Sequence, residues 1–134
     1  MKTAFIGLGS MGGGAALSAL RSGLDVTGVD PSDRARQAFG NRAVARGSDL
    51  DPGQEAVVVL TVNAAQAEAA LFGPEGAAQR LAPGGVVICS ATMAPADAKR
   101  LAAEAAARGL LYLDAPVSGG AAAAREGRMT VMAS

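Results

Sequence analysis

The sequence predicts an α/β fold, a Rossmann-type doubly wound parallel sheet, and three observations carry this prediction. Short apolar runs alternate with alanine-rich helical segments along the 134 residues. The clearest run, residues 56–62, is apolar at consecutive positions, as in a parallel strand that is buried on both faces. A glycine-rich turn, Gly7 to Gly12, follows the first apolar run. Strands that alternate with crossover helices in this way indicate a parallel sheet.

The predicted strands are runs rich in β-branched and aliphatic residues. They cover residues 3–6, 24–29, 56–62, 86–89 and 110–113, with a weak strand near 43–45 and a shorter last candidate at 129–132.

The predicted helices are recognised by apolar spacing and by their end signals. The first follows the glycine turn and ends at Gly23, a residue type that commonly terminates helices. A second is expected over 32–39, and a third over 64–72, where Gly73-Pro74 stops it. The fourth, 95–108, begins with Pro95, which suits the first helical turn. We expect the sheet to be incomplete at its C-terminal end and residues 1–134 to form one truncated domain.

Composition argues against several classes of function. The 12 basic residues equal the 12 acidic residues in number, whereas nucleic-acid binders normally carry a basic patch or a high pI. We therefore expect no nucleic-acid partner. The sequence has no histidine, so neither a Ser-His-Asp triad nor a histidine-ligated metal site can be built from these residues, and we expect no metal.

The single cysteine, Cys89, follows an apolar run and is interpreted as a buried thiol at a strand end. It has no partner for an internal disulfide, which favours a reducing compartment and hence the cytoplasm. The N-terminal segment has no charge between Lys2 and Arg21 and imitates a signal peptide, but its glycines make a poor apolar region. No stretch is long and apolar enough to predict a membrane partner.

The glycine turn is a GxGxxG motif with an acidic partner. Gly7 permits a tight turn, Gly9 leaves the backbone open to a pyrophosphate, and Gly12 lets the helix pack close to the strand. Asp30 ends the second predicted strand 23 positions after Gly7 and can accept hydrogen bonds from ribose hydroxyls. Its charge would repel a 2′-phosphate, so NAD is favoured over NADP, although the nearby Arg34 could tolerate a phosphate. The alternative is a plain glycine turn with a solvent-exposed Asp30.

A second cluster of polar groups follows the later strands. The loop 114–120 comes after the strand 110–113 and offers the hydroxyl of Ser118 and the backbone N–H groups of Gly119 and Gly120. These groups could hold a small carboxylate, since ligands bind beyond the carboxyl ends of parallel strands. Asn63 and Thr92 follow two other strands. The alternative interpretations are an ordinary connection for the loop and helix caps for the polar residues.

These motifs together resemble the β-hydroxyacid dehydrogenase family, which includes 3-hydroxyisobutyrate dehydrogenase. The resemblance rests on Gly-Leu-Gly-Ser-Met-Gly at 7–12, Asp-Ala-Pro-Val-Ser-Gly-Gly at 114–120 and Gly-Arg-Met-Thr-Val-Met at 127–132. Details at 62–66, 71–73 and 130–134 are most similar to the L-threonate dehydrogenase branch.

The resemblance implies an oxidoreductase that transfers hydride between a small hydroxy acid, such as L-threonate or 3-hydroxyisobutyrate, and NAD. It implies that Ser118, Gly119 and Gly120 bind the substrate. The cofactor contacts that it implies are Gly7, Leu8, Gly9, Ser10, Met11, Gly12, Asp30, Val62, Asn63 and Thr92.

The family's catalytic lysine lies downstream of residue 134, and the only lysines here, Lys2 and Lys99, are not in its motif. We therefore expect an N-terminal fragment that lacks the family's helical C-terminal domain, binds NAD weakly at most and turns nothing over. We also expect self-association into a homo-oligomer, because sheet edges and apolar helix faces invite it.

Two other functions remain open at this point. A stand-alone dinucleotide-binding module without catalysis fits the missing lysine, whereas the loop with Ser118 favours a dehydrogenase. A methyltransferase could carry a glycine loop of similar appearance, but the pair Met11-Gly12 and the loop with Ser118 argue against it.

Overall fold

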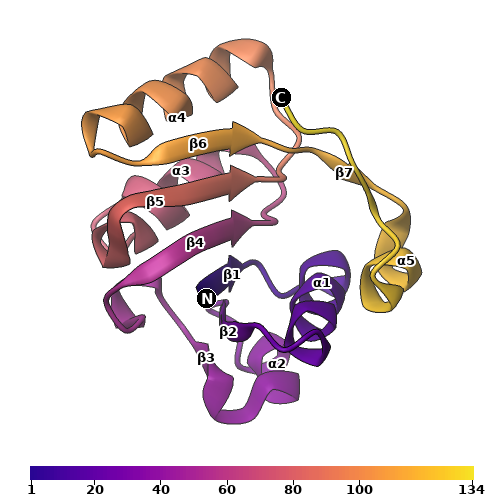
Figure 1. Ribbon diagram of the computed structural model, residues 1–134. Helices are drawn as coiled ribbons and strands as arrows, with labels where there is room; N and C mark the ends of the chain where they lie inside the picture. Colours follow the sequence, from indigo (N-terminus) through magenta and orange to yellow (C-terminus); the bar gives the residue numbers. More distant parts are fainter.

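A six-stranded parallel sheet forms the centre of the molecule, as the computed structural model of residues 1–134 shows (Figure 1). The strand order is β3-β2-β1-β4-β5-β6. The strands are β1 (Lys2–Ile6), β2 (Asp25–Val29), β3 (Ala43–Val44), β4 (Gln54–Val59), β5 (Leu81–Cys89) and β6 (Leu111–Asp114). The chain reverses its direction of travel across the sheet between β1 and β4, which is the arrangement of a doubly wound sheet. The predicted Rossmann-type fold is confirmed.

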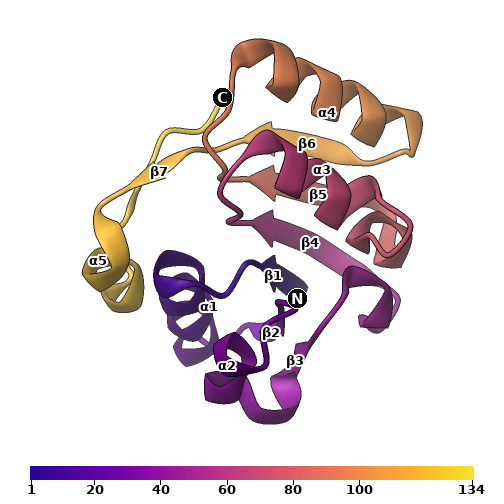
Figure 2. The same cartoon turned by 180° about the vertical axis from the view of Figure 1, so that it is seen from behind.

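Helices cover both faces of the sheet (Figures 1 and 2). The α-helices of this layered part are α1 (Ser10–Arg21), α2 (Asp33–Arg36), α3 (Ala64–Phe72) and α4 (Pro95–Ala107). Short 3₁₀ segments connect them to the strands: η1 (Gln37–Arg42), η2 (Gly47–Asp49) and η3 (Ala77–Arg80). None of the helices combines the length and the apolar character that crossing a bilayer requires.

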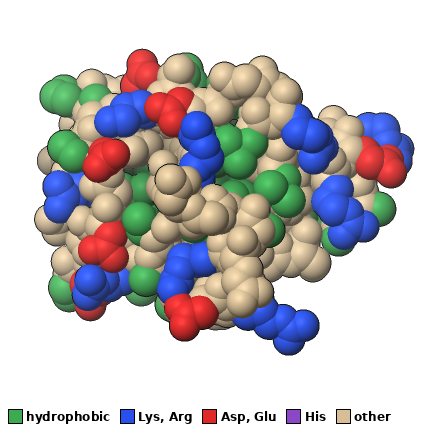
Figure 3. Space-filling model, turned by 90° about the horizontal axis from the view of Figure 1, so that it is seen from below, with side chains coloured by type: hydrophobic (Ala, Val, Ile, Leu, Met, Phe, Trp, Pro, Cys, Tyr) green, Lys and Arg blue, Asp and Glu red, His purple; other side chains and the backbone are tan.

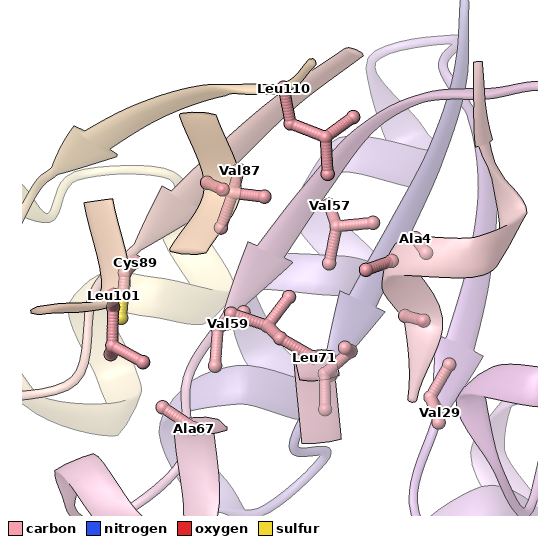
Figure 4. Close-up of a cluster of buried hydrophobic side chains, with 14 of the residues drawn as sticks. Ala4, Val29, Val57, Val59, Ala67, Leu71, Val87, Cys89, Leu101 and Leu110 are labelled. Carbon is pink, nitrogen blue, oxygen red and sulfur yellow. The ribbon is translucent and has the colours of Figure 1, made fainter. Parts of the chain in front are cut away.

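The hydrophobic core is divided by the sheet into two clusters. The larger one joins Val57, Val59 and Val87 of the central strands to Leu71 of α3 and Leu101 of α4 (Figure 4). The smaller one, on the opposite face, joins the side chains of β1 and β2 to α1 and η1. Because the central strands contribute side chains to both clusters, the sequence of β4 is apolar at consecutive positions.

The ends of several elements differ from the predicted ends. The predicted strand 56–62 stops at Val59 in the structure. The N–H of Leu60 still donates to the carbonyl of Ile6 at 2.8 Å, but Val62 is 79% exposed. Its N–H donates instead to Oε1 of Gln66 at 2.9 Å, because residues 60–62 already form the turn into α3. The predicted helix 32–39 is a four-residue α2 continued by η1.

The C-terminal segment is arranged differently from the central sheet. The predicted last strand is β8 (Thr130–Val131), which pairs antiparallel with β7 (Val117–Ser118) and forms a separate two-stranded sheet. Between them lies α5 (Gly120–Glu126), which was not predicted. Figures 1 and 2 show α5 beside α1, away from the helices α3 and α4.

A glycine in α1 allows α5 to approach closely. A Cβ atom on Gly14 would lie 2.9 Å from the backbone nitrogen of Arg125 and 3.3 Å from Cβ of Ala124. Ala124 is fully buried in the smaller core cluster. The run of small residues that follows the GxGxxG motif therefore provides the packing surface for α5.

Candidate functional site

The glycine turn has a separate steric reason for each of its three glycines. Gly7 has a φ of +92°, and a Cβ atom there would lie 2.8 Å from the carbonyl oxygen of Leu60. A Cβ atom on Gly12 would lie 1.8 Å from the carbonyl oxygen of Gly7, so this position joins α1 tightly to β1. A Cβ atom on Gly9 would meet nothing within 4 Å. The backbone at Gly9 is therefore open to an incoming group, as predicted for this position.

The first turn of α1 presents unpaired backbone donors. Gly9 is the N-cap residue, and no side chain caps the helix. The first N–H groups of a helix have no intrahelical partner, and together with the helix dipole they favour an anion. Ser10 is exposed. Met11 is partly buried and packs against the smaller core cluster, which also contains Leu8.

Asp30 lies at the carboxyl end of β2 and is tied to the glycine turn. Its Oδ2 accepts a hydrogen bond from the N–H of Leu8 at 2.9 Å. Its Oδ1 accepts one from the N–H of Ser32 at 2.9 Å. Each carboxylate oxygen can accept a further bond, so Asp30 combines a fixed position with free acceptor capacity. The alternative of a merely solvent-exposed Asp30 does not hold, because the residue is half-buried and anchored by two backbone groups.

A cavity of about 570 Å³ lies at this edge of the sheet. It runs along the carboxyl ends of β1, β2 and β4 and is bounded on one side by α3. Its lining includes Gly7, Gly9, Asp30 and Val62 from the predicted site. Apolar side chains provide a large part of the wall, including Ile6, Val29, Leu60 and Ala70. A mostly apolar cleft with a few fixed polar groups is the usual character of a cofactor site.

Asn63 is the N-cap of α3. Its Oδ1 accepts a hydrogen bond from the N–H of Gln66 at 2.9 Å, while the Gln66 side chain accepts one from Val62. The two side chains thus satisfy exposed donors at the helix start in a reciprocal manner. The structure gives Asn63 the capping role that was left open as an alternative, and it is not among the residues that line the cavity.

The remaining predicted residues lie outside this cavity. Thr92 is exposed in the loop between β5 and α4. Ser118 ends β7, and Gly119 and Gly120, with φ of +123° and +76°, begin α5. All three are exposed, and none lines the cavity that contains Asp30.

Two charged residues of the cavity were not predicted. Arg46 follows β3, and Glu75 lies in the connection between α3 and η3. Nε of Arg46 is 3.0 Å from Oδ2 of Asp49 and 3.3 Å from Oε2 of Glu75. The hydrogen bond with Asp49 and the two negative charges raise the pKa of Arg46, and the same bond lowers the pKa of Asp49. No sequence motif contains Arg46 and Glu75, because only the docking of η2 beside η3 brings them together.

Ion pairs between neighbours are a general feature of this surface. On the face that carries β3 and α2, basic side chains lie among acidic ones (Figure 3). Arg36 pairs with Asp33, and Arg42 pairs with Asp25 at 3.4 Å. A guanidinium nitrogen of Arg36 also donates to the carbonyl oxygen of Asp30 at 2.7 Å.

Neither lysine lies at this edge of the sheet. Nζ of Lys2 donates to the carbonyl of Pro52 at 2.9 Å, at the amino end of β1. Lys99 is exposed on α4. Cys89 is fully buried in the larger core cluster, as predicted, and forms no disulfide.

Comparison with known proteins gives a consistent result. The family described as the NAD binding domain of 6-phosphogluconate dehydrogenase matches residues 2–134. L-Threonate dehydrogenase of Haemophilus influenzae is 51% identical over 98% of this chain, and 2-hydroxy-3-oxopropionate reductase of Escherichia coli is 33% identical over 98%. A crystal structure of 3-hydroxyisobutyrate dehydrogenase from Salmonella typhimurium superposes with a TM-score of 0.92 at 43% identity over 99% of the chain.

The chain spans less than half the length of these proteins. It covers 45% and 46% of the two curated relatives and 47% of the crystallised chain. Within that span the likeness extends from the glycine turn to the last residues. The chain belongs to the family of NAD-binding domains that is described from 6-phosphogluconate dehydrogenase.

Proposed function

We propose that residues 1–134 are the NAD-binding domain of a dehydrogenase that transfers hydride between a small hydroxy acid and NAD. The observation that carries this proposal is the anchored carboxylate of Asp30 beside the open backbone of Gly9 in one cavity. The names of the relatives, which include L-threonate and 3-hydroxyisobutyrate dehydrogenases, favour these hydroxy acids as substrates of the whole protein.

A role is assigned to the residues that line the cavity and to the predicted residues that lie outside it. Asp30 accepts hydrogen bonds from the hydroxyls of the adenosine ribose with its free lone pairs. The backbone from Gly7 through Leu8, Gly9, Ser10, Met11 and Gly12 holds the pyrophosphate at the start of α1. Val62, Asn63 and Thr92, which follow β4 and β5, border the nicotinamide half. When bound, NAD supplies the nicotinamide carbon that accepts hydride.

The substrate contacts are assigned to the start of α5. Ser118 offers an exposed hydroxyl, and the positive φ angles of Gly119 and Gly120 turn the backbone into the helix. A hydroxyl and free backbone N–H groups can hold a small carboxylate without a metal. Ser118, Gly119 and Gly120 thus bind the hydroxy acid in the whole enzyme.

These 134 residues by themselves bind the dinucleotide without catalysis. A positioned group that moves a proton typically contributes ~10²- to 10⁴-fold to the rate. Lys2 and Lys99, the two lysines of this sequence, lie away from the cavity. No residue from 1 to 134 is assigned the catalytic role.

We also place the protein in the cytoplasm, acting as a homo-oligomer on a small molecule. The free, buried Cys89 supports a reducing compartment. Exposed apolar side chains at the β6 edge and in the C-terminal segment, Leu111 at 62% and Met132 at 53%, support self-association.

Titration of the chain with NAD and NADP tests the proposed site. We expect NAD to bind more tightly than NADP. Asp30→Ala should weaken NAD binding by about 10- to 100-fold, since hydrogen bonds to a charged group are worth ~1.5–3 kcal/mol each. Calorimetry measures tight binding, and chemical-shift titration of the nitrogen-15-labelled chain measures millimolar binding.

The matched control lies at the other end of the same strand. Asp25 is the first residue of β2, and Asp30 comes directly after the last residue of this strand. Asp25→Ala removes the same charge and the ion pair with Arg42, so NAD affinity should stay within about 2-fold of the unmodified chain. Equal losses in the two variants would contradict the assignment of Asp30, and a chain that bound neither dinucleotide would contradict the proposed function.

A further inference from the structure

The wall of the cavity opposite α3 is formed where β2 and β3 end side by side. The N–H of Asp30 donates to the carbonyl of Val44 at 3.1 Å. The next residues of the two strands, Pro31 on one side and Ala45 and Arg46 on the other, therefore line the same cavity. A phosphate on the ribose hydroxyl beside Asp30 would enter the space next to Arg46.

The Arg46 side chain is already occupied by two carboxylates. Nε and a terminal nitrogen donate to the two oxygens of Asp49 at 3.0 and 3.2 Å. Oε2 of Glu75 lies 3.3 Å from Nε. A planar guanidinium is well suited to binding a phosphate group. Here the two carboxylates of Asp49 and Glu75 outweigh its positive charge locally.

The main chain holds Glu75 in this position. The N–H of Ser48 in η2 donates to the carbonyl of Glu75 at 3.0 Å. Nε of Arg80 in η3 donates to the carbonyl of Ser48 at 3.0 Å. Glu75 lines the cavity itself, whereas Asp49 does not. Its charge therefore acts both on Arg46 and directly on whatever enters the cavity.

We propose that Glu75 is a specificity-determining residue that excludes dinucleotides with a 2′-phosphate, by repelling the phosphate and by neutralising Arg46. This inference rests on the proposed NAD site. It adds to Asp30 a second residue that discriminates NAD from NADP. A phosphate monoester carries ~−1.5 to −2 charges at pH 7. Both effects of Glu75 therefore act against NADP and leave NAD, which lacks that group, almost unaffected.

The test is the ratio of NADP affinity to NAD affinity in Glu75→Gln, measured by chemical-shift titration of the labelled chain. The substitution keeps the size of the side chain and removes its charge. Because both side chains are more than half exposed, we expect the ratio to rise by about 2- to 5-fold, with NAD affinity changed by less than about 2-fold. The rise should shrink in 1 M salt, where the screening length is ~3 Å.

Two further variants separate the charge of Glu75 from other effects. Glu104→Gln removes the same charge from an ion pair with Arg108 at 2.9 Å on α4, away from the cavity, and should leave the ratio unchanged. Adding Arg46→Ala to Glu75→Gln should reverse most of the rise in the ratio of NADP affinity to NAD affinity. This reversal would show that Arg46, and not the exposed Arg34, contacts the 2′-phosphate.

The outcomes distinguish this inference from the proposed function. NAD binding with an unchanged ratio in Glu75→Gln would overturn the inference alone. A gain that persisted in full in the double variant would overturn the role of Arg46. A chain that did not bind NAD would overturn the proposed function and, with it, the inference.

Discussion

The main-chain N–H of Leu8 donates to Oδ2 of Asp30 at 2.9 Å, across 22 positions of the sequence. This bond joins the glycine turn to the acidic end of the neighbouring strand. Asp30 therefore ties the turn to the end of β2 with only part of its acceptor capacity. A direct hydrogen bond joins the two halves of the predicted nucleotide motif.

Gly12→Ala should destabilise the fold. The new Cβ atom would lie 1.8 Å from the carbonyl oxygen of Gly7, a backbone atom that cannot move without displacing β1 from α1. We expect a loss of about 1–3 kcal/mol in the free energy of unfolding, the range for overpacked sites. Urea denaturation followed by circular dichroism measures this loss.

Gly9→Ala is the matched control, three positions before Gly12 in the same turn. Its Cβ atom would meet nothing within 4 Å, and its φ of −65° suits alanine. Stability should change by less than about 1 kcal/mol, the effect of a poorer N-cap, while NAD binding weakens because the methyl group enters the cavity. If the two variants unfolded at the same urea concentration, the steric assignment would be wrong.

Asn63→Ala should weaken the start of α3. It removes the acceptor that the N–H of Gln66 uses at 2.9 Å, and loss of an N-cap side chain typically costs ~1 kcal/mol. Asn63→Asp keeps an acceptor oxygen and should retain the stability of the unmodified chain. Urea denaturation compares the three proteins, and an Ala variant as stable as the Asp variant would show that the cap contributes nothing.

Tyr112 should titrate above its ordinary range in the folded chain. Burial raises its pKa, and the neighbouring Cys89 and Asp114 add to this effect. Its hydroxyl oxygen is buried. Because it is the single tyrosine and the chain has no tryptophan, absorbance at the tyrosinate band reports this residue alone.

The same shift links stability to pH. A raised pKa favours the protonated phenol in the folded state, so this contribution to stability is fully present below the unfolded value of 10.0 and is lost as the pH rises beyond it. The folded chain should therefore show less tyrosinate than the urea-unfolded chain between about pH 10 and 11. Coinciding titration curves would contradict the burial of the hydroxyl.

Local patterns made much of the fold predictable. The apolar runs and the glycine turn each reflect contacts within one strand–helix unit, so their spacing is visible in the sequence. The predictions were less accurate at element ends. Val62 continues the apolar run of β4 but turns outward, because the main chain there leaves the sheet to enter α3.

Two short segments near the C-terminus, β7 and α5, were not predicted, whereas the last strand, β8, was predicted over a longer range. The strands β7 and β8 have two residues each, and α5 is a seven-residue helix that begins with glycine. Such short elements depend on tertiary contacts for their stability. The contact of Gly14 with Arg125 is one of these, and it joins residues that no local motif relates.

The class of sheet, the glycine turn and the acidic residue that follows β2 can all be derived from the order of the residues. The other charges that face the cavity depend on the folded arrangement of the chain. Arg46 meets Glu75 because η2 docks tightly against η3, where a Cβ atom on Gly47 would lie 2.5 Å from the nitrogen of Ala77. The difference lies in the separation of the interacting residues along the chain. Strand and turn signals arise between residues that are close in sequence, whereas the charge of a cavity wall depends on how segments distant in sequence pack together.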